Sequence, residues 1–324
     1  MEGDLSAPEE KTEVAASPTC CVTGATGYIG SWLVKLLLER GYKVHATVRN
    51  PEKALHLLQL WNGGDRLRLF KADLLEEGSF DEAVKGCNGV FHVAASMEFD
   101  ANTNENIVKR VVFTSSISTI TAKDSNGNWR SVVDESCQTT IDPVLNAKAS
   151  GWVYVLSKLL TEEAAFKFAN ENAIDLVSVI TTTVAGPFLT TTIPSSIQVL
   201  LSPITGDPKY LSILSAVKAR MGSIALVHIE DICSAHIFLM EHDRAEGKYI
   251  CCACSSPMYE LINHLAQENP SLDIQRLEAG EKSTKPPEIS SRKLKDLGFT
   301  YKHGIEDIIH QTITACVDYG FLKI

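Results

Sequence analysis

The chain has 324 residues, of which 44% are hydrophobic and 22% charged, an ordinary composition for a globular protein. Its net charge is -10 and it has no arginine-rich tract, which argues against nucleic acid as a partner. No stretch approaches the roughly 18 consecutive apolar residues that a membrane span requires. The acidic residues 1–17 lack the basic start and apolar core of a signal peptide, so we expect a disordered tail on a cytoplasmic protein.

Nine cysteines, an odd number without a secretory signal, do not suggest a disulfide framework. The segment Cys251–Cys254 contains a C-x-x-C spacing, which is half of a zinc site or a redox pair. No second C-x-x-C or H-x-x-x-H follows it. We therefore interpret it as a buried strand and expect no metal.

Short apolar runs alternate with helical patterns through residues 18–186. Strands are expected at 19–23, 43–48, 66–73, 89–95, 110–116 and 175–183, and helices at 28–41, 51–60, 79–86 and 151–171. Strands separated by helices form a parallel sheet that is covered on both faces. Residues 187–324 are less regular and predict a smaller lobe, from which 223–252 returns to the sheet. The expected fold is α/β: a Rossmann-type doubly wound parallel sheet with a smaller C-terminal α/β substrate lobe.

Three glycines lie between the first expected strand and the first helix, in VTGATGYIG. Gly24 permits a tight turn, Gly27 lets backbone amides approach a pyrophosphate, and Gly30 lets the helix pack closely on the strand. A purely structural turn would not need all three. The strand-turn-helix context therefore predicts a dinucleotide site.

The end of the second strand indicates which dinucleotide is bound. An enzyme that uses NAD carries an acidic residue there for the ribose 2′-hydroxyl, but this chain has Arg49, which can bind a 2′-phosphate. The alternative is an ordinary surface arginine. We favour NADP(H). Asp73, after the third strand, could cap the next turn or accept a hydrogen bond from the adenine amine.

A serine, a tyrosine and a lysine could form a carbonyl-reducing site. Ser116 ends the fifth strand, while Tyr154 and Lys158 are four residues apart and share one helix face. Tyr154 would protonate a carbonyl oxygen, and the Lys158 ammonium would lower the tyrosine pKa from about 10. Ser116 would orient and polarise the carbonyl. Any amphipathic helix can produce such a pair by chance, so the rest of the chain must support the assignment.

The combination resembles the extended short-chain dehydrogenase/reductase family. VTGATGYIGSWLVKLLLERGY, VFTSSIST, GPF and LVHIEDICSAHIFLME are similar to its plant dihydroflavonol reductase and anthocyanidin reductase branch. The resemblance implies Ser116, Tyr154 and Lys158 as catalytic residues. It implies as cofactor-binding residues Gly24, Gly27, Tyr28, Ile29, Gly30, Arg49, Asp73, Leu74, Ala94 and Val184.

Two features depart from that family. A proline is usual near the end of the sixth strand, where this chain has Thr181, which affects the expected contacts with the nicotinamide carboxamide. Relatives also have a long helix between the fourth and fifth strands, where this chain offers only MEFDANTNENI. We expect the crossover helix around 96–108 to be truncated, as in an alternative splice product or a faulty gene model. Its absence would expose the apolar face of the sheet and of the Tyr154 helix, and it would remove part of the helical face on which many relatives dimerise.

The expected function is NADPH-dependent reduction of a carbonyl in a small phenolic or flavonoid-like substrate. Alternatives are a nucleotide-sugar epimerase or dehydratase, a steroid-type dehydrogenase and a non-catalytic NADP-binding protein. A cinnamoyl-CoA reductase would show a different sequence around the tyrosine. No nucleophile motif accompanies His92, His228 and His236, which we interpret as core or supporting residues. The sequence names neither the substrate, the stereochemistry nor the oligomeric state, monomer or homodimer.

Overall fold

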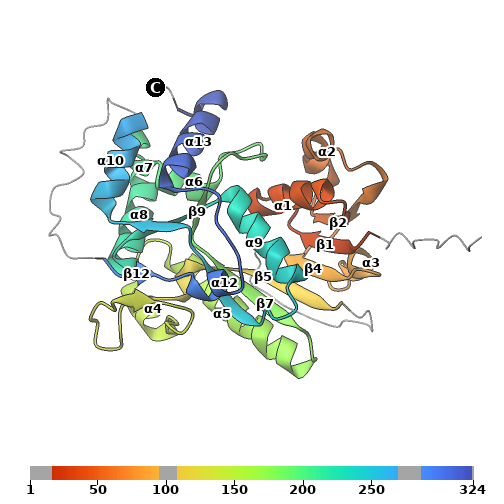
Figure 1. Cartoon of the computed structure of the whole chain (residues 1–324), viewed down its shortest axis with the longest axis horizontal. Helices are drawn as coiled ribbons and strands as arrows, with labels where there is room; N and C mark the ends of the chain where they lie inside the picture. The colour runs from red at the N-terminus through yellow and green to blue at the C-terminus, as the bar shows by residue number, and fades with distance from the viewer. Residues whose placement is uncertain (1–16, 95–107, 269–285, 323–324) are drawn as a thin grey trace, which may run out of the picture.

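The central feature of the computed structural model, which describes residues 17–94, 108–268 and 286–322, is a seven-stranded parallel sheet (Figure 1). The strand order is β10-β7-β5-β4-β1-β2-β3. The strands are β1 (Thr19–Thr23), β2 (Lys43–Val48), β3 (Leu67–Lys71), β4 (Gly89–His92), β5 (Arg110–Ser116), β7 (Leu176–Thr181) and β10 (Gly247–Cys251). The order reverses between β1 and β4, where doubly wound sheets bind ligands at the carboxyl ends of the strands. The Rossmann-type prediction is confirmed.

Helices cover both faces of this sheet. On one face α1 (Tyr28–Glu39) packs against α9 (Ile229–Glu241), and Phe91 of β4 and Val112 of β5 join their apolar core (Figure 1). On the other face lies α5 (Trp152–Glu171), whose Glu162 accepts a hydrogen bond from Ser178 of β7. Alternate residues of each strand thus contact different layers, as a sheet buried on both sides requires.

The C-terminal part has a core of its own. Strands β8 (Thr183–Ala185), β9 (Ile224–His228) and β11 (Cys254–Ser256) form a small sheet in the order β11-β9-β8. Its helices, on the left of Figure 1, are α6 (Ser195–Leu200), α7 (Ser202–Thr205), α8 (Pro208–Met221), α10 (Met258–Glu268) and α13 (Ile305–Asp318). α8 begins at Asp207, whose side chain accepts hydrogen bonds from two backbone amides, and ends at Gly222 with a φ of +74°.

The remaining elements are shorter. They are α2 (Leu55–Trp61), α3 (Asp81–Val84), α4 (Ile141–Ala147), α12 (Arg292–Asp296), β6 (Val132–Val133), β12 (Glu288–Ile289) and the 3-10 turns η1 (Pro51–Ala54), η2 (Gly64–Arg66) and η3 (Ile117–Thr119). The pairing of β6 with β12 fastens the segment after β5 to the C-terminal region.

The expected strand 175–183 is divided in two at Thr182. The Thr182 hydroxyl donates to the Cys251 carbonyl at 3.1 Å, and there the chain leaves the large sheet for β8. The predicted return of 223–252 involves both sheets: β9 lies in the small one, while α9 and β10 belong to the large one. The domain boundaries at 18, 186 and 187 stay predictions.

The predicted tail of 1–17 lies outside the described residues apart from its last position, and so does the predicted truncated crossover, apart from Val108. The flanking strands β4 and β5 are parallel neighbours. On α5, Val153 is 52% exposed and Leu160 47%. Each helix in the described part of the chain is too short or too polar to cross a membrane.

Candidate active site

The glycine loop after β1 forms a cradle with little room for side chains. Gly24 has a φ of +65°, and the Gly27 amide donates to its carbonyl oxygen at 2.9 Å. A Cβ on Gly30 would lie 2.3 Å from that same oxygen, so only glycine lets α1 begin so close to the loop. α1 has no acidic residue in its first turn, and its positive end is available to an anion. These features fit the pyrophosphate of a dinucleotide.

The other residues expected around the cofactor lie close to this loop. The amide of Ala94 donates to the Thr23 hydroxyl oxygen at 3.1 Å, joining the ends of β4 and β1. The Tyr28 hydroxyl donates to the Gly186 carbonyl oxygen at 3.0 Å, which connects α1 to the chain just after β8. Ile29 packs against the main core, and Val184, on β8, is buried in it.

Arg49 and Asp73 follow the neighbouring strands β2 and β3. Arg49 is exposed, and no carboxylate in the described ranges pairs with it. Asp73 caps its own turn, since its carboxylate accepts a hydrogen bond from the Leu75 amide at 3.1 Å. This is one of its two expected roles. Leu74 is half-buried in the same turn.

Ser116 and Tyr154 meet at the carboxyl end of β5. Ser116 is buried, and its hydroxyl oxygen accepts a hydrogen bond from the Ser118 amide at 3.2 Å. Tyr154 exposes 53% of its surface, and its hydroxyl is near enough to the Ser116 side chain for the serine to affect the tyrosine pKa. Burial of that hydroxyl raises the tyrosine pKa, while the Ser116 side chain and the charge of Arg220 act to lower it.

Lys158, one turn after Tyr154, is buried beneath it on α5. Its ammonium donates to the Thr114 carbonyl oxygen at 3.0 Å and lies 5.8 Å from the centre of the Phe113 ring. Burial lowers the lysine pKa to about 8, against the opposing charge of Glu162. Lys158 therefore remains mostly protonated at neutral pH.

Glu162 is the next residue in this row along α5, and it was not predicted. It is 1% exposed, and it accepts hydrogen bonds from Ser178 and from Lys248, each at 2.7 Å. The regular spacing of 154, 158 and 162 in the sequence could have indicated it. Its negative charge helps to hold the Lys158 cation in a buried position.

Arg220, in the last turn of α8, was also not predicted from the sequence. Its guanidinium is near enough for its charge to act on Tyr154, and burial lowers the arginine pKa to about 10. No local pattern marked it, because α8 belongs to the irregular C-terminal part and only folding brings it to β5.

Thr181, which replaces the expected proline, lies opposite Ser116 on the neighbouring strand. Its hydroxyl donates to the Ser115 carbonyl oxygen at 3.3 Å. The side chain thus joins β7 to β5 at the level of the site.

Of the three histidines considered in the sequence, His228 and His236 are buried and His92 is half-buried, and burial of the rings lowers each pKa to about 4. His92 stacks on Phe113, with ring centres 5.7 Å apart. His236 lies 2.7 Å from the Ile232 carbonyl through Nδ1 and 2.8 Å from the Thr114 hydroxyl through Nε2. Since a carbonyl only accepts, Nδ1 carries the proton and Nε2 accepts from Thr114.

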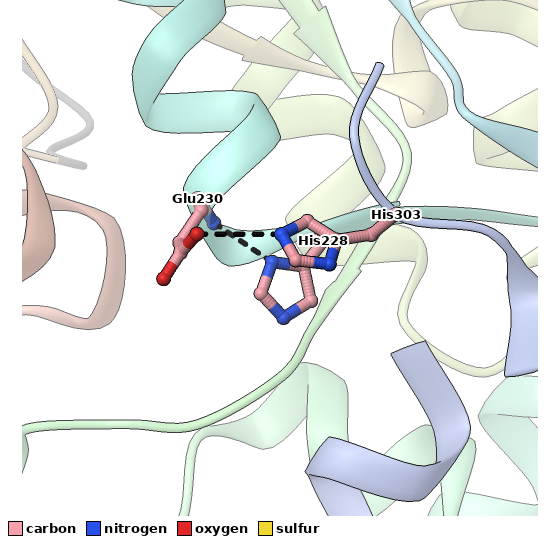
Figure 2. A group of neighbouring side chains, drawn as sticks. All are labelled: His228, Glu230 and His303. Atoms are coloured by element: carbon pink, nitrogen blue, oxygen red, sulfur yellow. Dashed lines mark hydrogen bonds and ion pairs between the residues drawn. The ribbon is translucent and has the colours of Figure 1, made fainter. Parts of the chain in front are cut away.

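His228, Glu230 and His303 form a cluster whose possible ligand atoms lie within 4.8 Å of one another (Figure 2). His228 Nδ1 already accepts the Glu230 amide hydrogen at 3.2 Å, and His303 Nε2 lies 3.3 Å from the Glu230 carboxylate. The cluster is also at the positive N-terminus of α9, which disfavours a cation. We assign it to capping this helix.

A cavity of about 410 Å³ lies elsewhere, between β11, β12 and α12. Cys254, Ile289 and Lys295 are among its lining residues. Its lining includes no residue of the predicted site.

With this geometry established, comparison with known proteins places the chain in a family. Residues 20–252 match the model of the NAD dependent epimerase/dehydratase family, and the chain belongs to that family. It is an oxidoreductase of the extended short-chain dehydrogenase/reductase type, for which a nicotinamide cofactor and a small-molecule substrate are expected.

The relatives narrow the class. The chain is 44% identical to a candidate anthocyanidin reductase from Ginkgo biloba, covering 98% of this chain and 99% of that protein. It is 40% identical to a dihydroflavonol 4-reductase from Arabidopsis thaliana, covering 96% and 85%. The crystal structure of vestitone reductase from alfalfa, 32% identical, covers 94% of this chain and 99% of its own with a TM-score of 0.79. These similarities confirm the predicted family branch.

Proposed function

We propose that the chain is an NADPH-dependent reductase that acts on a carbonyl of a small flavonoid-like substrate, with Tyr154 as the proton donor. One observation carries the proposal: the Tyr154 side chain lies beside Ser116 at the carboxyl end of β5, with the buried cation Lys158 one turn further along α5. The named activities of the relatives, dihydroflavonol and anthocyanidin reduction, supply the substrate class.

The residues present fit the cofactor. The glycine cradle and the N-terminus of α1 would hold its pyrophosphate, and Arg49 would bind a 2′-phosphate. Lys158 would contact the ribose next to the nicotinamide. When bound, NADPH supplies a hydride to the carbonyl carbon.

Side chains of the protein then bind and protonate the carbonyl oxygen. Ser116 binds and orients the carbonyl oxygen, and Tyr154 transfers its phenolic proton to that oxygen as the carbon gains the hydride. The products are an alcohol, NADP⁺ and a tyrosinate that recovers a proton from solvent. A positive charge near Tyr154 stabilises the tyrosinate, which otherwise would be costly in a buried position.

The test compares the wild type with Tyr154→Phe in the reduction of a dihydroflavonol, with NADPH affinity measured by cofactor fluorescence. We expect kcat to fall by about 100-fold or more while the affinity for NADPH is unchanged. Tyr210→Phe, a tyrosine on α8 beside Lys209, is the matched control and should behave as wild type.

Equal turnover in the wild type and Tyr154→Phe would overturn the proton-donor assignment. A wild type that binds NADPH tightly but reduces no carbonyl would favour the non-catalytic alternative. Preference for NADH would contradict the role of Arg49 and return attention to an epimerase or dehydratase.

A further inference from the structure

Two contacts fix α8 beside the Tyr154 site. Near its start, Ser212 accepts a hydrogen bond from Ser150 at 3.0 Å, just ahead of α5. At its end, Met221 is buried in one cluster with Ile117 and Ile180. Ile117 directly follows Ser116, and Ile180 belongs to β7. α8 therefore runs from the beginning of α5 to the end of β5, and Arg220 lies next to the buried Met221.

Arg220, which is half-buried, has one buried donor without a partner. Its Nε is buried without a hydrogen-bond acceptor, and the ion pairs found among the described residues do not include it. A buried guanidinium without a carboxylate is unfavourable unless another group compensates for its lost hydration. Its charge instead interacts with Tyr154, and although burial lowers the arginine pKa to about 10, the group stays protonated at neutral pH.

The cofactor phosphates are not the missing acceptor. The phosphate cradle follows β1 and Arg49 follows β2, whereas Arg220 is next to Met221, which packs with Ile117 just after β5. β5 is three strands from β2, about 14 Å across the sheet. The remaining candidate for the acceptor is the molecule that Tyr154 protonates.

We infer that Arg220 belongs to the substrate site, where its guanidinium binds an oxygen of the substrate beside the carbonyl that Tyr154 protonates. This inference rests on the proposed function. A guanidinium presents several N–H donors in one plane and favours two neighbouring oxygens. The substrate class is therefore a ketone with a second hydroxyl or phenolate oxygen next to the carbonyl.

A matched pair of substrates tests this preference. A dihydroflavonol carries a hydroxyl on the carbon next to the carbonyl, and the corresponding flavanone lacks it. The wild type should prefer the dihydroflavonol in kcat/KM. Arg220→Gln should lower kcat/KM with both substrates, because the charge of Arg220 also acts on Tyr154, but by about 10- to 100-fold more with the dihydroflavonol than with the flavanone. Arg220→Lys keeps the charge without the planar fork and should be intermediate. Lys209→Gln, an exposed lysine of the same helix, is the control and should match the wild type.

A second experiment separates a ligand-binding role from a structural one. In Arg220→Ala, added millimolar guanidinium chloride should restore part of the lost dihydroflavonol reduction, because the free ion can occupy the vacated position. The same salt should have no such effect on the wild type or on Lys209→Gln. NADPH affinity and the melting temperature, measured in parallel, show that each variant is folded.

The inference is overturned if Arg220→Gln keeps the substrate preference of the wild type, or if guanidinium restores nothing to a folded Arg220→Ala. Either result leaves the proposed function intact as long as Tyr154→Phe is inactive. An active Tyr154→Phe would instead reject the proposed function, whatever Arg220 does.

Discussion

The two ends of the proposed cofactor site differ in how their positive charges are placed. At the phosphate end Arg49 is exposed after β2, and the backbone of the glycine cradle supplies the remaining donors. At the Tyr154 end Lys158 is 8% exposed and donates to a backbone carbonyl, while Arg220 contributes a second, half-buried cation whose Nε is fully buried.

This difference indicates a division of labour. An exposed charge is screened by water and salt, so it selects among ligands by a modest amount. A buried charge acts through a lower effective dielectric and changes the proton affinity of its neighbours strongly. Cofactor choice should therefore depend weakly on Arg49, and the chemical step strongly on the buried cations.

The largest effect should come from Lys158→Met. Removing the ammonium leaves Tyr154 with less stabilisation of its ionised form, so kcat/KM should fall by about 100- to 10,000-fold. Lys248→Met is the matched control, because it also takes a cation from Glu162 but lies on β10, away from Tyr154. Both variants should lose stability, since each leaves the buried carboxylate with one partner fewer. Wild-type turnover in Lys158→Met would contradict the role of a buried cation.

The phosphate end could be predicted from sequence because it is encoded locally. Gly24, Gly27 and Gly30 lie in one short loop, and the expected binding of a phosphate there depends on the backbone conformation of that loop alone. Tyr154 and Lys158 could be paired because a helix fixes their spacing. Both signals are contained in segments shorter than a single element.

The rest of the site depends on contacts between distant segments. Arg220 lies on α8, which is held beside β5 by the packing of Met221 on Ile117. No pattern near position 220 in the sequence predicts that contact. The small β11-β9-β8 sheet was also missed as a unit, since β8 has three residues and was merged with the preceding strand. Long-range packing, unlike periodicity, leaves no mark in a short window of sequence.

An effect of intermediate size concerns the pH dependence of the free energy of unfolding. His92, His228 and His236 have pKa values of about 4 in the folded protein, below the ordinary 6.5, so the unfolded chain binds protons first as the pH falls. Their contribution is fully present above pH 6.5 and is lost between pH 6.5 and 4, by about 2 kcal/mol per histidine at pH 5.

Urea unfolding at pH 7 and pH 5 measures this loss. His236→Asn should be less stable at pH 7 but should lose about 2 kcal/mol less than the wild type between the two values. His310→Asn, which changes a histidine with a 63% exposed side chain, should keep the full dependence. The same slope in His236→Asn and in the wild type would show that His236 is not held neutral by burial.

The smallest effect should be that of Arg49→Gln. Because Arg49 is exposed, its interaction with a 2′-phosphate is partly screened, and we expect NADPH affinity to fall only about tenfold while NADH affinity is unchanged. Arg40→Gln, an exposed arginine after α1, controls for the change in net charge. The difference between wild type and Arg49→Gln should shrink as salt is added. If it persisted at high salt, the phosphate would be held in a desolvated contact, and the contrast between an exposed and a buried end of the site would not hold.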